Sequence, residues 1–148
     1  MQLGNEIMKA MILDDDRVIL ALLSRIFQRR GYEVVTYADP TACPLYLAEF
    51  CQCPTDRLCP MVIVSDYLMP SVNGVEFIEA LRKKGCMCSR VALISGTLLA
   101  QATMERLAQL EVKFFPKTAL FIHQLSDWLN QIELASLLES AMLGSCRA

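Results

Sequence analysis

Carboxylates follow two short apolar runs of this chain, where strands are expected to end. Asp14 and Asp15 follow Lys9–Leu13, and Asp66 follows Met61–Ser65. An apolar run without polar alternation is typical of a strand buried on both faces of a parallel sheet. Ligands bind at the carboxyl ends of such strands. We therefore expect the three carboxylates to lie close together, although Asp66 considered alone would only be expected to cap the next helix.

A hydroxyl and an ammonium group follow the next two apolar runs, as Ser95 and Lys117. Crowded carboxylates repel one another, and a hard divalent cation such as Mg2+ relieves that repulsion with oxygen ligands. A hydroxyl and a lysine beside a carboxylate suit the oxygens of an added phosphoryl group. The chemistry indicated is formation of an acyl phosphate on Asp66.

Strand and helix patterns alternate five times along the chain, which predicts an α/β fold with one parallel sheet covered by helices on both faces. The expected strands are Lys9–Leu13, Tyr32–Tyr37, the run into Asp66, Arg90–Ser95 and Val112–Phe115. The expected helices are Arg17–Arg30, a short one from near Cys43, Val75–Lys84, Leu98–Leu110 and a last one from about Thr118 to Leu143.

Length and charge narrow the function classes. The 148 residues, 54% of them hydrophobic, suffice for one domain with a sizeable core. The net charge of -2 gives no electrostatic footprint for nucleic acid or an anionic membrane. No signal segment or membrane span is apparent, so we expect a cytoplasmic protein.

The polar strand ends together resemble the receiver domain of two-component response regulators, the CheY-like family. The motifs are Asp-Asp after the first strand, Asp-x-x-Met-Pro from Asp66, Ser-Gly from Ser95, and Lys117 after the fifth strand. The resemblance covers residues 9–131 and leaves 1–8 as a lead and 132–148 as a helical extension and tail. It implies a flavodoxin-like doubly wound five-stranded sheet of order 2-1-3-4-5.

The resemblance also implies a signalling role. A sensor histidine kinase or phosphotransfer protein would donate the phosphoryl group. The readout would be a protein partner or a second copy, bound through the fourth helix, the fifth strand, the fifth helix and the C-terminal extension. Such a domain is not an enzyme in the ordinary sense, since it catalyses only its own phosphorylation and dephosphorylation.

Individual roles carry over by position in the motifs. Asp66 matches the phosphoacceptor, Asp15 the direct Mg2+ ligand and Asp14 its partner that acts through water. The backbone carbonyl of Leu68 matches the position that completes the metal site.

Three further positions match the phosphoryl-binding and switch residues. Ser95 matches the hydroxyl that closes on the phosphoryl group, and Lys117 matches the cation that pairs with it. Phe114 falls where the family often has an aromatic switch residue, although an ordinary core residue of an edge strand fits the same position.

The chain departs from the family pattern at three places. Thr118 follows Lys117 where the family commonly has proline, so the loop there is expected to differ. Leu68 is apolar where many receivers carry a polar side chain that positions the hydrolytic water, which predicts slow autodephosphorylation. A cysteine-bearing loop lengthens the connection between the second and third strands.

Five of the seven cysteines precede the third and fourth strands, which are neighbours in the expected sheet. Cys51, Cys53, Cys59, Cys86 and Cys88 could therefore gather at the amino-terminal edge, opposite Asp66. Inert thiols are the favoured interpretation. A disulfide or redox pair and a metal site stay open, although Cys-x-Cys is not the usual zinc spacing.

The last expected helix carries one apolar stripe and is longer than the sheet. Phe121, Leu125, Trp128, Ile132, Ala135, Leu138 and Met142 recur at spacings of three and four. A helix from Thr118 to Leu143 would be about 39 Å long, against about 17–20 Å for a strand. The overhang should pack on a second copy or a partner, fold back after a break, or begin a linker. His123 on this helix is expected to be a surface or interface residue.

Other classes remain to be weighed. A haloacid-type phosphatase also uses a strand-end aspartate with Mg2+, but it would show Asp-x-Asp at the nucleophile and a longer cap region. A degenerate receiver that binds partners without phosphorylation is disfavoured because every charged position of the site is filled. A receiver fragment of a larger regulator stays open.

Overall fold

The computed structural model describes residues 7–51 and 60–145 and contains one parallel five-stranded sheet of order β2-β1-β3-β4-β5. This confirms the predicted topology. The strands are β1 (Lys9–Leu13), β2 (Glu33–Tyr37), β3 (Val62–Asp66), β4 (Val91–Ser95) and β5 (Lys113–Pro116). Every residue of β3 and β4 is buried, as expected for central strands covered on both faces.

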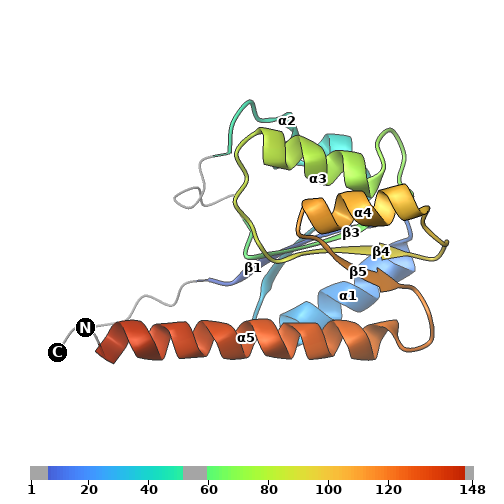
Figure 1. Ribbon diagram of the computed structural model, residues 1–148. Helices are drawn as coiled ribbons and strands as arrows, with labels where there is room; N and C mark the ends of the chain where they lie inside the picture. The colour runs from blue at the N-terminus through green and yellow to red at the C-terminus, as the bar shows by residue number, and fades with distance from the viewer. Residues whose placement is uncertain (1–6, 52–59, 146–148) are drawn as a thin grey trace.

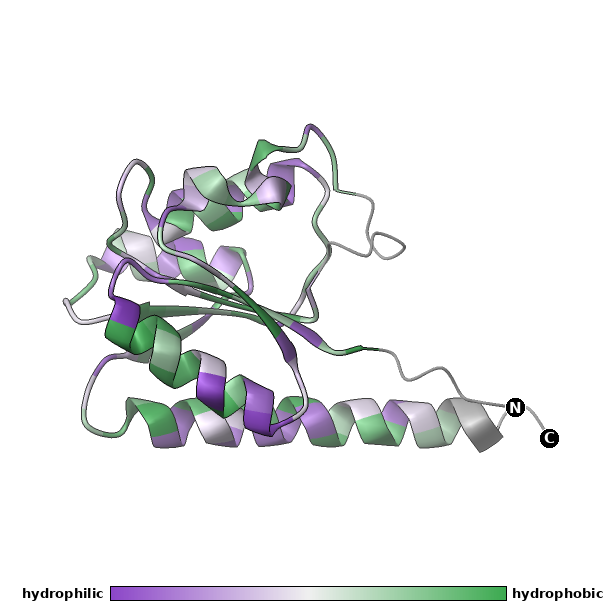
Figure 2. Ribbon diagram, turned by 180° about the vertical axis from the view of Figure 1, so that it is seen from behind, coloured by the Kyte–Doolittle hydropathy of each residue, from purple (hydrophilic) through white to green (hydrophobic). Residues whose placement is uncertain are grey.

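Helices cover both faces of the sheet (Figure 1). The helices are α1 (Arg17–Arg29), α2 (Pro44–Leu47) after the 3-10 turn Pro40–Ala42, α3 (Gly74–Lys83), α4 (Gln101–Gln109) and α5 (Phe121–Ser145). Alternate residues of each strand enter two separate cores. Met11, Ile63 and Leu93 pack toward α2, α3 and α4, whereas Ile12, Val64 and Ile94 pack toward α1 and α5. Figure 2 shows the strands as a largely hydrophobic layer between the helices.

Two helices begin later than predicted. Helix α4 begins at Gln101 instead of Leu98, because the backbone of its N-cap residue Ala100 is extended, with a ψ of 152°. Leu98 lies before the helix and is fully exposed. Helix α5 begins at Phe121 instead of Thr118, because residues 118–120 form a turn in which the Thr118 carbonyl accepts the N–H of Phe121. The predicted short helix near Cys43 is confirmed, with Cys43 as its N-cap.

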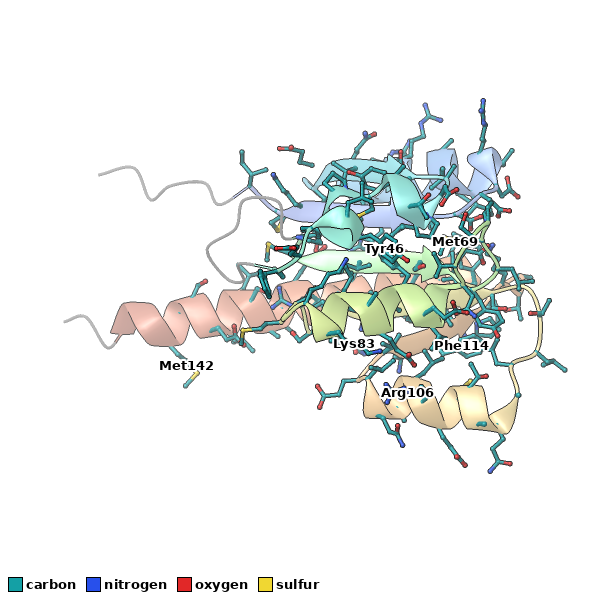
Figure 3. All side chains as sticks on the ribbon, turned by 90° about the horizontal axis from the view of Figure 1, so that it is seen from above. Tyr46, Met69, Lys83, Arg106, Phe114 and Met142 are labelled. Atoms are coloured by element: carbon teal, nitrogen blue, oxygen red, sulfur yellow. The ribbon has the colours of Figure 1, made fainter. Side chains whose placement is uncertain are left out.

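Helix α5 extends beyond the sheet, as predicted. Its 25 residues make it about 38 Å long. Phe121, Leu125 and Leu129 are buried against the sheet, whereas Leu134, Leu138 and Met142 are exposed. Figure 3 shows Met142 on the overhanging part, at the opposite end of the molecule from Met69, which follows β3. Within the described residues no helix is long and apolar enough to cross a membrane.

The turn from β3 into α3 brings the chain tightly against the strand ends. A Cβ on Gly74 would lie 2.3 Å from the Asp66 carbonyl oxygen and 2.5 Å from Leu93 Cδ1, so only glycine fits. Asn73 caps α3 by accepting the N–H of Glu76 at 2.9 Å. This turn fixes where the end of β3, and therefore Asp66, lies.

Candidate phosphoacceptor and metal site

Three carboxylates meet at the carboxyl ends of β1 and β3. One ligand oxygen from each of Asp14, Asp15 and Asp66 lies within 4.8 Å of the other two. Asp14 is fully buried, Asp66 is 6% exposed and Asp15 is exposed. β1 and β3 are hydrogen-bonded neighbours in the sheet, which accounts for this meeting of residues 52 positions apart in the sequence.

Lys117 bridges two of these carboxylates from the end of β5. Its Nζ lies 2.9 Å from Asp14 Oδ2 and 3.1 Å from Asp66 Oδ1. The backbone N–H of Lys117 donates to the Ser95 carbonyl at 2.7 Å, which ties the β5 end to β4. One cation therefore offsets part of the charge of two buried carboxylates.

The two oxygens of Asp66 differ in their surroundings. Oδ1 accepts the N–H of Tyr67 at 3.0 Å and pairs with Lys117. Oδ2 has no hydrogen-bond partner within the part of the chain that the structure describes. Oδ2 is thus the oxygen of Asp66 that is available to another group.

Burial and the charge of Asp14 raise the pKa of Asp66 to about 6, even though Lys117 and the Tyr67 N–H act in the opposite direction. Burial lowers the pKa of Lys117, but its hydrogen bonds and charge interactions with Asp14 and Asp66 outweigh this, so its pKa is raised overall. The folded protein therefore disfavours the ionised form of Asp66, while Lys117 stays charged.

Ser95 lies at the end of β4 with its hydroxyl engaged by Thr97. Ser95 Oγ lies 3.0 Å from the Thr97 carbonyl oxygen and 3.1 Å from Thr97 Oγ1, and it accepts the Thr97 N–H at 3.1 Å. Ser95 is thus at the predicted strand end without a hydrogen bond to Asp66. The Ser-Gly-Thr sequence could have indicated this local turn, since serine side chains commonly bond to backbone two residues on.

Leu68 lies next to the site, and Phe114 lies in the sheet. The Leu68 side chain is exposed, two residues after Asp66. Phe114 is half-buried on β5 and packs against the core beneath α3 and α4. Figure 3 shows Phe114 and Met69 toward the same end of the molecule. Both interpretations of Phe114, as switch residue and as core residue, stay predictions.

The predicted thiol cluster is described only in part. Cys51, Cys86 and Cys88 belong to the same hydrophobic core, and the Cys51 N–H donates to the Lys84 carbonyl at 2.7 Å. Cys53 and Cys59 lie outside the described residues. Within residues 7–51 and 60–145, the one group with metal-binding spacing is the three carboxylates.

Comparison with known proteins agrees with this geometry. The response regulator receiver domain family matches residues 10–119. The chain belongs to this family. The receiver shares 36% identity over 76 residues with hybrid signal transduction histidine kinase C of Dictyostelium discoideum, which is 51% of this chain and 6% of that protein. It shares 33% identity over 79 residues with the alkaline phosphatase synthesis transcriptional regulatory protein PhoP of Bacillus subtilis, which is 53% of this chain and 30% of that protein.

Solved structures show the same fold. A response regulator receiver protein from Pseudomonas putida superposes with a TM-score of 0.68 at 18% identity, over 84% of this chain and 97% of that one. A CheY-like receiver domain protein from Methanospirillum hungatei gives a TM-score of 0.66 at 18% identity, over 86% and 94%. The receiver spans at most 30% of the length of the two curated relatives, so their output activities do not transfer to it directly.

Proposed function

We propose that Asp66 accepts a phosphoryl group from a phosphohistidine in a Mg2+-dependent reaction, and that this modification switches the protein partners of the receiver. The donor would be a sensor histidine kinase or a phosphotransfer protein. The observation that carries the proposal is the convergence of Asp14, Asp15 and Asp66 with Lys117 bridging two of them.

The donor set fits Mg2+. Carboxylate oxygens within 4.8 Å of one another can share one small, hard cation, which keeps several water ligands in such sites. Asp14, Asp15, Asp66 and the Leu68 carbonyl would hold the ion. When bound, Mg2+ supplies positive charge that neutralises both the carboxylates and the incoming phosphoryl oxygens.

Asp66 is the nucleophile in this proposal. Its Oδ2 would attack phosphorus and form an O–P bond as the N–P bond of the phosphohistidine breaks and the electron pair returns to the imidazole nitrogen. Tyr67 and Lys117 hold Oδ1, which fixes the orientation of the carboxylate. Lys117 already lies at Asp66 and would pair with a phosphoryl oxygen after transfer.

Ser95 supplies the switch in this proposal. Its hydroxyl would leave Thr97 and donate to a phosphoryl oxygen, which releases the turn between β4 and α4. Phe114 on the neighbouring strand would fill the space that this movement opens. The change would reach partners through α4, β5 and α5, including the exposed part of α5.

The domain division and the location stay proposals too. Residues 9–131 would form the receiver, with 132–148 as an extension that contributes to partner binding. A cytoplasmic location remains a prediction from the sequence. A receiver that acts without phosphorylation would need a site unable to hold a phosphoryl group, whereas this site retains each charged residue.

Phosphorylation with a small donor tests the proposal. Wild-type receiver incubated with acetyl phosphate and Mg2+ should give a phosphorylated species on a phosphate-affinity gel, and EDTA should prevent it. Asp66→Asn and Asp15→Asn should give none, whereas Asp127→Asn, which removes an exposed carboxylate on α5, should match wild type. Equal labelling of Asp66→Asn and wild type would refute the assignment of Asp66.

A further inference from the structure

A pocket lies at the amino-terminal edge of the sheet, opposite Asp66. It has a volume of about 300 Å3, which is at the lower end of the range for small-molecule sites. Met8, Tyr32, Met61 and Arg90 line it, and each stands one residue before the first residue of β1, β2, β3 or β4. Ile132, which also packs against the core, and the exposed Leu137 contribute the opposite wall from α5.

The tyrosine in this pocket has an unused hydrogen-bonding group. Tyr32 is only 4% exposed, and its ring packs edge-on against Phe27 at 5.2 Å. Its hydroxyl has no hydrogen-bond partner within the described residues. Since no fully buried side-chain nitrogen or oxygen there lacks a partner, the hydroxyl is accessible from the pocket. A hydroxyl that is accessible in this way can donate a hydrogen bond to an acceptor bound in the pocket.

The charged side chains that line the pocket, Arg30, Arg90 and Glu133, carry one positive charge in excess. Arg30 pairs with Glu133 at 3.0 Å and donates to Asn130 at 2.9 Å and to the Ser126 carbonyl at 3.2 Å. Arg90 donates to the Ser136 hydroxyl at 2.8 Å and has no carboxylate partner within the described residues. Arg30, Arg90 and Glu133 line the same pocket as Tyr32. Burial and the charge of Glu133 raise the pKa of the Tyr32 hydroxyl, while Arg90 and Arg30 act in the opposite direction.

We propose that this pocket binds a small amphipathic monocarboxylate, with its apolar body against Met8, Met61, Ile132 and Leu137 and its carboxylate between Tyr32 and Arg90. The walls are mainly apolar, and the Tyr32 hydroxyl and the Arg90 guanidinium, which also donates to Ser136, both belong to residues that line the pocket and can donate to one anionic group. Such a ligand would link the extended part of α5 to the edge of the sheet. This site is separate from Asp66, and the proposal does not depend on phosphorylation.

The probes are octanoate and its uncharged counterpart octanamide, tested on the unphosphorylated full chain without Mg2+. Octanoate should raise the melting temperature saturably and bind once per chain in native mass spectrometry. Octanamide should bind at least about ten-fold more weakly, because it lacks the charge that Arg90 would pair with. Equal binding of the two, or no saturable binding of octanoate, would overturn the proposal.

Two variants remove one donor each and keep the apolar surface. Tyr32→Phe deletes only the hydroxyl, and Arg90→Met deletes only the guanidinium, and each should weaken octanoate roughly ten-fold or more. Tyr37→Phe, at the other end of β2, and Arg25→Met, exposed on α1, are the matched controls and should bind as wild type does. Unchanged affinity in both pocket variants would refute the site.

A second copy of the chain is the competing occupant. If the pocket were filled by another copy, the wild type would be a dimer that does not bind octanoate, and Leu137→Asp would dissociate it. That outcome would overturn the small-ligand proposal. A monomer that binds one octanoate supports it.

Discussion

Replacing the phosphoacceptor by its uncharged isostere should stabilise the receiver when Mg2+ is absent. Burial and Asp14 raise the pKa of Asp66 from 3.8 to about 6. A difference of about two pKa units corresponds to about 3 kcal/mol, at about 1.36 kcal/mol for each unit. Asp66→Asn removes the ionised carboxylate, and we expect it to raise the free energy of unfolding by about this amount at pH 7.

The sign of the pH dependence follows from the raised pKa. Between pH 4 and pH 6 the folded protein keeps a proton on Asp66 that the unfolded chain has released. The contribution of Asp66 to stability is therefore full below about pH 4 and is lost as the pH rises through about 6. The stability difference between Asp66→Asn and wild type should accordingly be largest at pH 7 and small near pH 4.

Urea unfolding in EDTA at pH 7 and pH 4 measures this difference. A gain of about 3 kcal/mol corresponds to a rise in melting temperature of roughly 6–12 °C for a chain of this size. Asp15→Asn, which changes an exposed carboxylate at the same edge of the sheet, is the control and should show a much smaller effect without metal. An Asp66→Asn variant less stable than wild type at pH 7 would show that the Lys117 ion pair outweighs burial, which refutes the reasoning.

Four further predictions concern the site and its supports. Adding Mg2+ should raise the melting temperature of wild type, because the ion binds to the folded state. Asp15→Asn should lose most of that rise, and an equal rise in the two proteins would exclude Asp15 as a ligand. Leu68→Asn should shorten the lifetime of the phosphorylated form, followed by loss of the phosphate-affinity gel band after donor removal; an unchanged or longer lifetime would contradict a role for this position in slow hydrolysis. Lys117→Met leaves Asp14 and Asp66 without their shared cation and should destabilise the Mg2+-free protein by about 3 kcal/mol in urea; no loss would mean that the ion pair contributes nothing net. Leu125→Ala removes a fully buried side chain between α5 and the sheet and should lower the free energy of unfolding by about 3 kcal/mol in the same assay. Leu134→Ala, at an exposed position of α5, should lower it little, and similar losses in the two variants would contradict the described packing.

The fold was predictable because its pattern is local. The apolar runs that end in Asp14, Asp66 and Ser95 leave few arrangements in a parallel sheet with right-handed crossovers, and the family resemblance implied the strand order that is observed. The order of these polar strand ends also sufficed to indicate the family. The positions of the strand ends do not predict in which direction their side chains point. Ser95 lies where expected, but its bonds to Thr97 depend on the turn that follows.

Other features depend on contacts that sequence periodicity does not encode. The residues 118–120 form a turn before α5, which a helical pattern through Thr118 does not reveal. Tyr32 and Arg90 looked like ordinary residues at strand starts. That both line one pocket becomes apparent only when α5 covers the edge of the sheet.

Native mass spectrometry of the receiver with Mg2+, before and after acetyl phosphate, tests the central claim most directly. Wild type should gain one phosphoryl group, and its balance between monomer and dimer, or its binding of an added partner, should change with it. Asp66→Asn should gain none and should keep the unphosphorylated state. Absence of a phosphoryl group on wild type, under conditions that label a control receiver, would contradict the claim that this site is a phosphorylation switch.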